Sequence, residues 1–253
     1  LELNRSLEMR VEQRTAALES ANHELEAFAH SVAHDLRAPL HQISGFAELL
    51  REAAAAGRTA DSAECVERIS GAARRMDQLI VDLLDFARTS LTEPVLDEVD
   101  LDRTLEEALD LVRPDLAGRA IEWLREPLPR VRGDARLLRQ GFVNLLSNAI
   151  KYTRTRTPAR IEVGHRAGRA DEVVLFVRDN GIGFDMQQAR RLFGAFGPLH
   201  SARGYEGTGL GLANVQRIVA RHGGRVWAEG SVDRGAAFYF TLTPVDRSPG
   251  TES

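Results

Sequence analysis

The feature that most constrains this chain is a change in the spacing of its apolar residues near Thr92-Glu93-Pro94. Before that point apolar residues recur at helical spacing, and after it they fall in short alternating segments separated by turn residues. A helical stripe needs a partner along one face, whereas alternating segments build a sheet. We therefore expect two units, a helical one followed by an α/β one.

The helical unit is expected to be an antiparallel hairpin. Apolar residues follow heptad spacing over residues 7–32 and continue to Leu50, then break over residues 53–57 and resume over residues 66–87. Each helix carries an apolar stripe too wide for a single partner to cover. Two hairpins from two chains would close a dimeric four-helix bundle. A monomeric hairpin packed on the C-terminal unit is the alternative.

The second unit is expected to be an α/β sandwich, because short strands alternate with amphipathic helices. The expected strands are residues 121–124, 161–164, 173–177, 225–229 and 237–242, and the expected helices are residues 101–111, 135–152, 187–193 and 210–222. Residues 230–235 are expected to form a hairpin turn between the last two strands.

The whole-chain composition excludes several classes of function. With 253 residues and 43% hydrophobic residues, the chain can bury its cores without disulfides or structural metals. A net charge of −4 gives no global reason to bind nucleic acid or an anionic membrane. Cys65 is the single cysteine and no apolar run is long enough to span a bilayer, so we expect a cytoplasmic fragment without direct membrane contact. The start at Leu1 suggests a piece of a longer protein.

Three segments of the second unit carry groups suited to a nucleotide. Asn144, Asn148, Lys151 and Tyr152 fall on one face of the expected helix, where amide oxygens suit Mg²⁺, the ammonium suits phosphate and the ring suits a base or ribose. A solvated helix face is the equally plausible alternative. The run from Asp179 to Gly183 follows an apolar strand and places a carboxylate beside two glycines. An ordinary turn without a binding role would have the same sequence pattern.

Alternating glycines over residues 207–211 open the last expected helix. Backbone N–H groups at a helix start point at anions, so this segment is predicted to cradle phosphate. It is too short for a Walker loop and lacks Gly-Lys-Ser/Thr.

These segments, with Leu192-Phe193-Gly194-Ala195-Phe196 and residues 230–235, resemble in type and order the N, G1, F, G2 and G3 boxes of the histidine-kinase ATPase domain. That domain has the Bergerat (GHKL) ATP-binding fold shared with DNA gyrase. The resemblance implies ATP binding by Asn144, Asn148, Lys151, Tyr152, Asp179, Gly181, Gly183, Gly207, Thr208, Gly209, Leu210 and Gly211, with Mg²⁺ on Asn148 and Asn144.

The segment from Phe28 to Leu40 resembles the H-box of the histidine-kinase dimerisation and phosphoacceptor (HisKA) domain. The resemblance implies that His34 accepts the phosphoryl group and that Asp35 orients its ring. A lone helical histidine is more often a surface residue without a catalytic role. The match of the surrounding residues to the H-box favours the phosphoacceptor role here. Residues 1–22 then read as a coiled-coil signalling linker, 23–91 as the HisKA domain, 97–246 as the ATP-binding domain and 247–253 as a disordered tail.

The resemblance also implies partners. The expected reaction is ATP-dependent autophosphorylation of His34, followed by transfer to an aspartate of a response regulator receiver domain, within a homodimer and under an upstream sensor of PAS or phytochrome type. Pro198 stands where many relatives carry a basic residue, with Arg203 as a possible substitute, and Ala38 replaces the Thr or Asn of strong phosphatases. The rival functions are a scaffold without kinase activity and an ATPase that works by conformational change.

Overall fold

The computed structural model describes Thr15, residues 32–33, 36–91, 93–116, 118–169, 171–194 and 209–245. The chain divides into two units, Leu1–Val81 and Asp82–Ser253. Within the described residues, no helix combines the length and the apolar composition that crossing a membrane requires. Apart from Thr15, the coiled-coil linker predicted for residues 1–22 lies outside the described residues, as does the tail predicted for residues 247–253.

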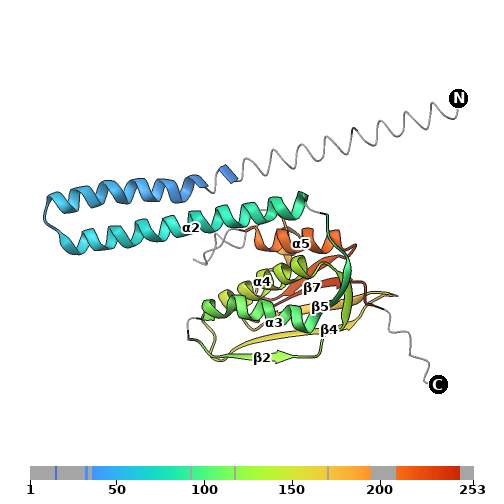
Figure 1. Cartoon of the computed structure of the whole chain (residues 1–253). Coiled ribbons are helices and arrows are strands. Elements are labelled where there is room, and N and C mark those ends of the chain that lie inside the picture. The colour runs from blue at the N-terminus through green and yellow to red at the C-terminus, as the bar shows by residue number, and fades with distance from the viewer. Residues whose placement is uncertain are drawn as a thin grey trace, which may run out of the picture. The chain divides into compact units, whose positions relative to one another are not determined.

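The predicted hairpin makes up most of the described part of the first unit, and its second helix extends beyond Val81 (Figure 1). One helix covers residues 36–55, and α2 covers Thr59–Leu91. The turn between them closes when the Arg58 N–H donates to the Ala53 carbonyl at 2.9 Å, with Gly57 at a φ of 67°. A left-handed glycine after the last helical turn satisfies carbonyls that the helix leaves open. The break predicted for residues 53–57 is confirmed.

The two hairpin helices run antiparallel and are linked by side chains. Arg75 Nη2 donates to Gln42 Oε1 at 2.7 Å, and the Arg68 guanidinium lies 5.9 Å from the centre of the Phe46 ring. The partner residue number falls as the α2 residue number rises, as an antiparallel pair requires.

One apolar stripe of the hairpin stays exposed. Val66 and Ile80 are 48% and 43% exposed, and Ala73, midway between them at heptad spacing, is also exposed. On the other helix Leu40 is 50% exposed. Contiguous apolar surface of this kind is typical of an interaction face.

The second unit is built on a five-stranded sheet in the order β2-β4-β5-β7-β6. Its strands are β2 (Ile121–Arg125), β4 (Ala159–Ala167), β5 (Val173–Asp179), β6 (Val226–Gly230) and β7 (Ala236–Leu242). The β2–β4 pair is parallel and the other pairs are antiparallel. Strands β1 (Asp97–Asp100) and β3 (Arg130–Gly133) form a separate antiparallel pair.

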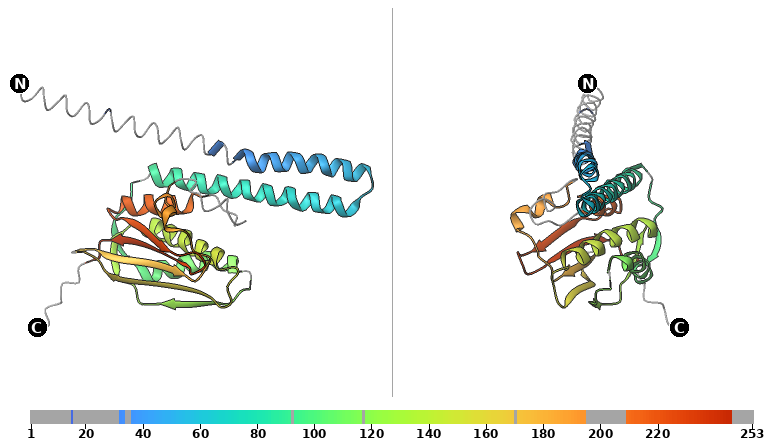
Figure 2. Two further views of the ribbon diagram at one scale, coloured as in Figure 1. Left: turned by 180° about the vertical axis from the view of Figure 1, so that it is seen from behind. Right: turned by 90° about the vertical axis from the view of Figure 1, so that its left-hand side faces the viewer.

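Three helices cover one face of this sheet in both views of the second unit (Figure 2). They are α3 (Leu101–Val112), α4 (Ala135–Tyr152) and α5 (Gly211–Arg221). Their apolar faces and one face of the sheet share a single core, whose fully buried members include Leu105, Phe142, Leu175 and Ile218. The predicted α/β sandwich is confirmed.

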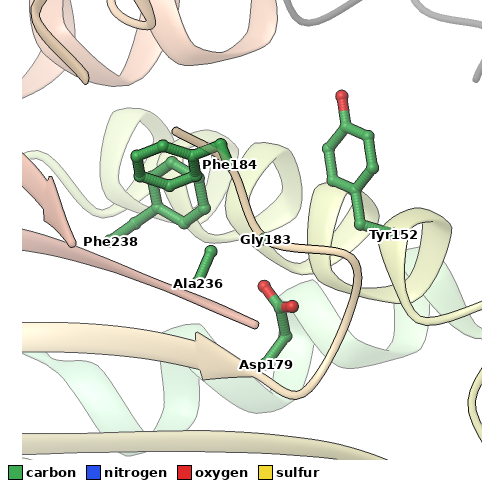
Figure 3. Close-up of a pocket in the computed structure, with 6 residues that line it drawn as sticks. All are labelled: Tyr152, Asp179, Gly183, Phe184, Ala236 and Phe238. Atoms are coloured by element: carbon green, nitrogen blue, oxygen red, sulfur yellow. The ribbon is translucent and has the colours of Figure 1, made fainter. Parts of the chain in front are cut away.

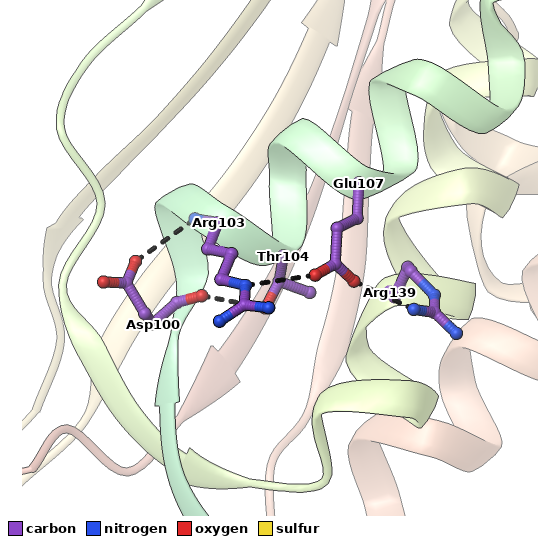
Figure 4. Close-up of polar contacts among 5 residues, drawn as sticks. All are labelled: Asp100, Arg103, Thr104, Glu107 and Arg139. Carbon is purple, nitrogen blue, oxygen red and sulfur yellow. Dashed lines mark hydrogen bonds and ion pairs between the residues drawn. The ribbon is translucent and has the colours of Figure 1, made fainter.

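Polar contacts fix the ends and the spacing of these helices (Figure 4). Asp100 caps α3 by accepting the Arg103 N–H at 3.2 Å, and Thr104 Oγ1 donates to the Asp100 carbonyl at 2.8 Å. Glu107 accepts from Arg103 at 3.2 Å and from Arg139 of α4 at 2.8 Å. The bond from Arg139 lowers the pKa of Glu107. The capping carboxylate is what makes Leu101 the first helical residue.

The opposite face of the sheet is covered by its own side chains. Phe176 and Tyr239 are buried there, with Arg178 and Arg166 placed 5.2 and 4.9 Å from the centres of their respective rings. Arg178 also donates to Glu162 at 2.8 Å. Cations stacked on the rings and paired with acids let apolar strands face water.

Two features differ from the prediction. The strands 97–100 and 130–133 were not predicted, because each has four residues and only its partner gives it a ladder. The helix predicted for residues 187–193 is a 3₁₀ helix, η2 (Met186–Arg191). It is too short to close successive α-helical bonds.

Candidate nucleotide-binding site

A small cavity lies where α4, β5 and β7 meet. Its lining residues come from four segments and are Tyr152, Asp179, Gly183, Phe184, Ala236 and Phe238 (Figure 3). Asp179 is the last residue of β5 and pairs with Ala236, the first residue of β7. The antiparallel register therefore brings the strand-end acid and the start of β7, which carries Phe238, to one end of the sheet.

Asp179 is the charged group of this cavity. Its side chain points into the space between Ala236 and Tyr152, and the residue is 6% exposed. Burial raises its pKa to about 6, against the lowering effect of the Gly181 and Ala236 N–H groups and of Arg156. The Gly181 N–H donates to Oδ1 at 2.7 Å. A buried carboxylate that is largely ionised at pH 7 is a strong acceptor for an exocyclic amine.

The turn after Asp179 has no room for a side chain at either of its two glycines. Gly183 has a φ of 60°, and a Cβ there would lie 1.9 Å from the Ser231 carbonyl oxygen. A Cβ on Gly181 would lie 2.5 Å from the Tyr152 carbonyl oxygen. Both predicted glycines are therefore required by close backbone approach, which leaves a bare backbone at the cavity wall.

Asn180, which lies between Asp179 and Gly181, has a structural role. Its N–H donates to the Arg160 carbonyl, its Oδ1 accepts the Arg160 N–H at 2.9 Å, and its Nδ2 donates to the Pro158 carbonyl at 2.9 Å. The side chain thus holds the start of β4 and is not available to a ligand.

The polar face of α4 lies partly buried. Asn144, Asn148 and Lys151 are half-buried and Tyr152 is buried. Lys151 Nζ is 3.3 Å from the Tyr152 hydroxyl and 4.7 Å from the ring centre. This contact places a cation and an aromatic ring side by side on the helix.

Asn144 is oriented toward the start of α5. A Cβ built on Gly211 would lie 3.6 Å from Asn144 Oδ1, so the amide faces the first turn of that helix. Its Nδ2 is buried and has no hydrogen-bond partner among the described residues. A buried donor without a partner is costly unless a ligand supplies the acceptor. The start of α5 carries Leu210, whose side chain has no polar atom to cap the helix.

The groups present fit a nucleotide with a divalent cation. The amide oxygens of Asn144 and Asn148 are hard ligands of the kind Mg²⁺ binds, and the Asn144 donor and the α5 start suit phosphate oxygens. The structure brings Tyr152, Asp179 and Gly183 together and places Gly211 beside Asn144. The predicted residues that lie outside the described part of the chain are His34, Asp35, Gly207 and Thr208, together with Pro198 and Arg203.

Sequence reasoning missed two neighbours of the site. Arg156 bonds the Gly181 carbonyl at 2.9 Å, and Asp233 bonds the Ile182 carbonyl through its N–H at 2.6 Å. Arg156 belongs to none of the predicted motifs, and Asp233, within the segment 230–235, was not singled out; no spacing in the sequence places either residue near Asp179. Only the β6–β7 turn, predicted as a hairpin, indicated that residues 230–235 approach this end of the sheet.

This fold and these groups define a class of proteins that join a helical hairpin to an α/β nucleotide-binding sandwich. Residues 133–246 match the family described as histidine kinase-, DNA gyrase B- and HSP90-like ATPases. Residues 24–91 match the His Kinase A (phospho-acceptor) domain. The chain belongs to the sensor histidine kinases of two-component systems.

Curated relatives agree with the family. The chain is 39% identical over 233 residues to the methanogenesis regulatory histidine kinase FilI of Methanothrix harundinacea, covering 92% of this chain and 26% of that protein. It is 36% identical over 226 residues to cyanobacterial phytochrome A of Nostoc sp., covering 89% of this chain and 29% of the relative. The chain thus spans between a quarter and a third of the length of these relatives.

A solved structure agrees as well. Full-length ShkA in complex with AMPPNP superposes with a TM-score of 0.55 at 28% identity, covering 87% of this chain and 46% of that one.

Proposed function

We propose that the chain uses Mg-ATP to phosphorylate its own His34. The observation that carries the proposal is the convergence of Asp179, Gly183 and Tyr152 on one cavity beside the polar face of α4, in a chain that also carries a phospho-acceptor domain. The domain boundaries 1–22, 23–91, 97–246 and 247–253 belong to the same proposal.

Each group has a task in binding. The Asp179 carboxylate accepts from the exocyclic amine of adenine, and the bare backbone at Gly183 lets the base approach. Tyr152 lies beside the base or ribose, and Lys151 neutralises phosphate charge. Gly207, Thr208, Gly209, Leu210 and Gly211 cradle the phosphates. Bound through Asn148 and Asn144, Mg²⁺ would neutralise phosphate charge.

The phosphoryl acceptor is a ring nitrogen of His34. A neutral imidazole has a lone pair that can attack the γ-phosphorus while the bond to the leaving ADP oxygen breaks. Asp35 accepts from the other ring nitrogen, which fixes the tautomer and stabilises positive charge on the ring.

The active species in this proposal is a homodimer. Val66, Ala73 and Ile80 form an exposed apolar stripe on the described hairpin. A second hairpin placed on this stripe would bury it and complete a four-helix bundle. The exposure of the stripe supports a dimer over a monomeric hairpin.

The remaining partners follow from the chemistry of phosphohistidine. This labile phosphoramidate must pass its phosphoryl group on, and an aspartate of a response regulator is the proposed acceptor. Ala38 is exposed and has no polar group to orient water, so phosphatase activity toward that partner should be weak. The similarity to a phytochrome supports an upstream sensor of PAS or phytochrome type in the full-length protein. The single cysteine, Cys65, fits the reducing cytoplasm.

The test is incubation of the full chain and of His34→Gln with γ-labelled ATP and Mg²⁺, followed by acid and base treatment. Acid-labile, base-stable label that disappears in the variant would support the kinase. ATP binding without any label would favour a scaffold. Phosphate release without phosphohistidine would favour an ATPase that works by conformational change.

A further inference from the structure

Arg156 connects two turns that are distant in the sequence. Its Nη2 donates to the Gly181 carbonyl at 2.9 Å and to the Asp233 carbonyl at 2.9 Å. Gly181 belongs to the turn that follows β5, and Asp233 lies at the tip of the β6–β7 hairpin. One guanidinium therefore bridges the turn that follows Asp179 and the tip of the β6–β7 hairpin.

The backbone around this bridge is held under strain. Asp233 has a φ of 62°, a left-handed conformation that side-chain-bearing residues rarely adopt. Its N–H donates to the Ile182 carbonyl at 2.6 Å, while the Ile182 N–H donates to the Tyr152 carbonyl at 3.2 Å. Strained residues persist only where neighbours hold them, and Arg156 supplies one of the hydrogen bonds that hold Asp233.

Arg156 also places a positive charge beside the cavity. Its side chain is 30% exposed, and its Nε is buried without a hydrogen-bond partner among the described residues. The Asp233 carboxylate lies 3.7 Å from Nη2, and the charge of Arg156 lowers the pKa of the Asp179 carboxyl. The guanidinium thus partly offsets the effect of burial, which raises the pKa of Asp179.

We propose that Arg156 is a positioning residue of the nucleotide site, which fixes the Gly181–Gly183 turn against the β6–β7 hairpin so that Asp179 and the bare backbone face the adenine at a set spacing. This inference rests on the proposed ATP binding and adds a residue outside its motifs. Because Arg156 holds this turn against the hairpin, its loss is expected to lower nucleotide affinity.

The test measures ADP binding to the full chain by titration calorimetry from pH 5 to pH 8. Arg156→Met should weaken ADP binding about tenfold, the effect of losing one to two hydrogen bonds. It should also raise the pH at which binding is half lost to acid, because Asp179 loses a neighbouring cation. A role confined to folding stability would not move this midpoint.

Arg156→Lys retains the charge and one bond, so it should keep the wild-type acid midpoint and recover part of the affinity. The matched control is Arg160→Met, which removes a nearby arginine whose side chain is 53% exposed and bonds Glu122 at 3.0 Å. The control should bind ADP within about twofold of wild type, as expected for an exposed ion pair.

Wild-type affinity and an unmoved acid midpoint in Arg156→Met would overturn the inference. If that variant does not fold, Arg156→Lys decides: weaker ADP binding at an unchanged midpoint supports the inference, and unchanged binding overturns it. Failure of the wild-type chain to bind ADP would overturn the proposed function itself. That outcome is distinct from any effect of the Arg156 variants, because it is measured without them.

Discussion

Asp179 is a buried residue whose carboxylate is charged at neutral pH, and the fold must stabilise that charge. The residue is 6% exposed, yet it receives the Gly181 N–H at 2.7 Å and lies in the field of Arg156. These contacts offset only part of the cost of burial, since its pKa stays raised at about 6. The site therefore keeps a poorly solvated acceptor, which a ligand's amine group can satisfy.

Asp179→Asn is expected to stabilise the ligand-free chain at pH 7 and to weaken nucleotide binding at least tenfold. A raised folded pKa contributes stability that is fully present below the unfolded value of 3.8 and is lost as the pH rises through about 6. The ionised carboxylate therefore costs about 2 to 3 kcal/mol at pH 7. Asn avoids this cost and can still accept the Gly181 N–H.

Urea unfolding at pH 7 and pH 4.5 checks this expectation. The stability gain should be present at pH 7 and should shrink at the lower pH, where wild-type Asp179 is protonated. Asp110→Asn, which removes an exposed carboxylate paired with Arg113, should change stability little at either pH. A gain of equal size at both values would contradict the link to ionisation.

Gly183→Ala should lower the free energy of unfolding by more than a strained backbone conformation would alone, because the new Cβ also clashes with a neighbour. Its φ is 60°, and the added Cβ would meet the Ser231 carbonyl oxygen at 1.9 Å. Gly118 has a similar φ of 74° with nothing within 4 Å, so Gly118→Ala measures the strain alone, about 1 kcal/mol. Thermal unfolding should show Gly183→Ala losing roughly 2 kcal/mol or more. Equal losses in both variants would show that the turn can move aside.

At the scale of elements, the junction of α4, α5 and β3 depends on His222. Its Nε2 accepts the Asp134 N–H at 2.9 Å, and its Nδ1 bonds the Ile218 carbonyl at 2.7 Å. Asp134 in turn caps α4 by accepting the Leu137 N–H at 3.1 Å and receives the Val95 N–H at 3.1 Å. The imidazole thus connects the end of one site helix to the start of the other.

His222→Ala should therefore cost about 2 to 4 kcal/mol, because it leaves two buried polar groups without partners and opens a cavity. His165 offers a control, since it is half-buried and its Nδ1 has no partner among the described residues. His165→Ala should cost clearly less in denaturant unfolding. Comparable losses would argue that the His222 bonds add nothing beyond packing.

The sequence predicted the elements with strong local patterns and missed those that depend on partners. The hairpin break near Gly57 and the strand predicted for residues 173–177, which the structure extends to Asp179, followed from residue type and spacing. The β1–β3 pair was missed because four-residue strands carry too little pattern. Arg156 was missed because its acceptors, Gly181 and Asp233, are distant backbone carbonyls that no local pattern reveals.

At the scale of the whole molecule, the candidate nucleotide site and the exposed apolar stripe lie in different units. Every member of the large core lies between Val99 and Leu242, and the cavity is lined by residues of the second unit alone. The exposed stripe of Val66, Ala73 and Ile80 belongs to the first unit. Nucleotide affinity should therefore be insensitive to changes in this stripe.

The double variant Val66→Glu/Ile80→Glu should separate the two activities in the full chain. Two carboxylates on the stripe would have to be buried in a bundle, which costs several kcal/mol and should shift the chain to monomers in analytical ultracentrifugation. ADP affinity should stay within about twofold, since these residues belong to the first unit and the cavity is lined by residues of the second unit alone. Labelled phosphohistidine should fall at least tenfold.

Arg74→Glu is the matched control, because it reverses a charge at an exposed position of α2 beside the stripe. It should leave both the dimer and the label intact. A double variant that remains dimeric would show that the stripe is not the interface. A monomer that still labels fully would show that one chain supplies both the nucleotide and the acceptor, so that the bundle serves signalling and is not needed for the chemistry.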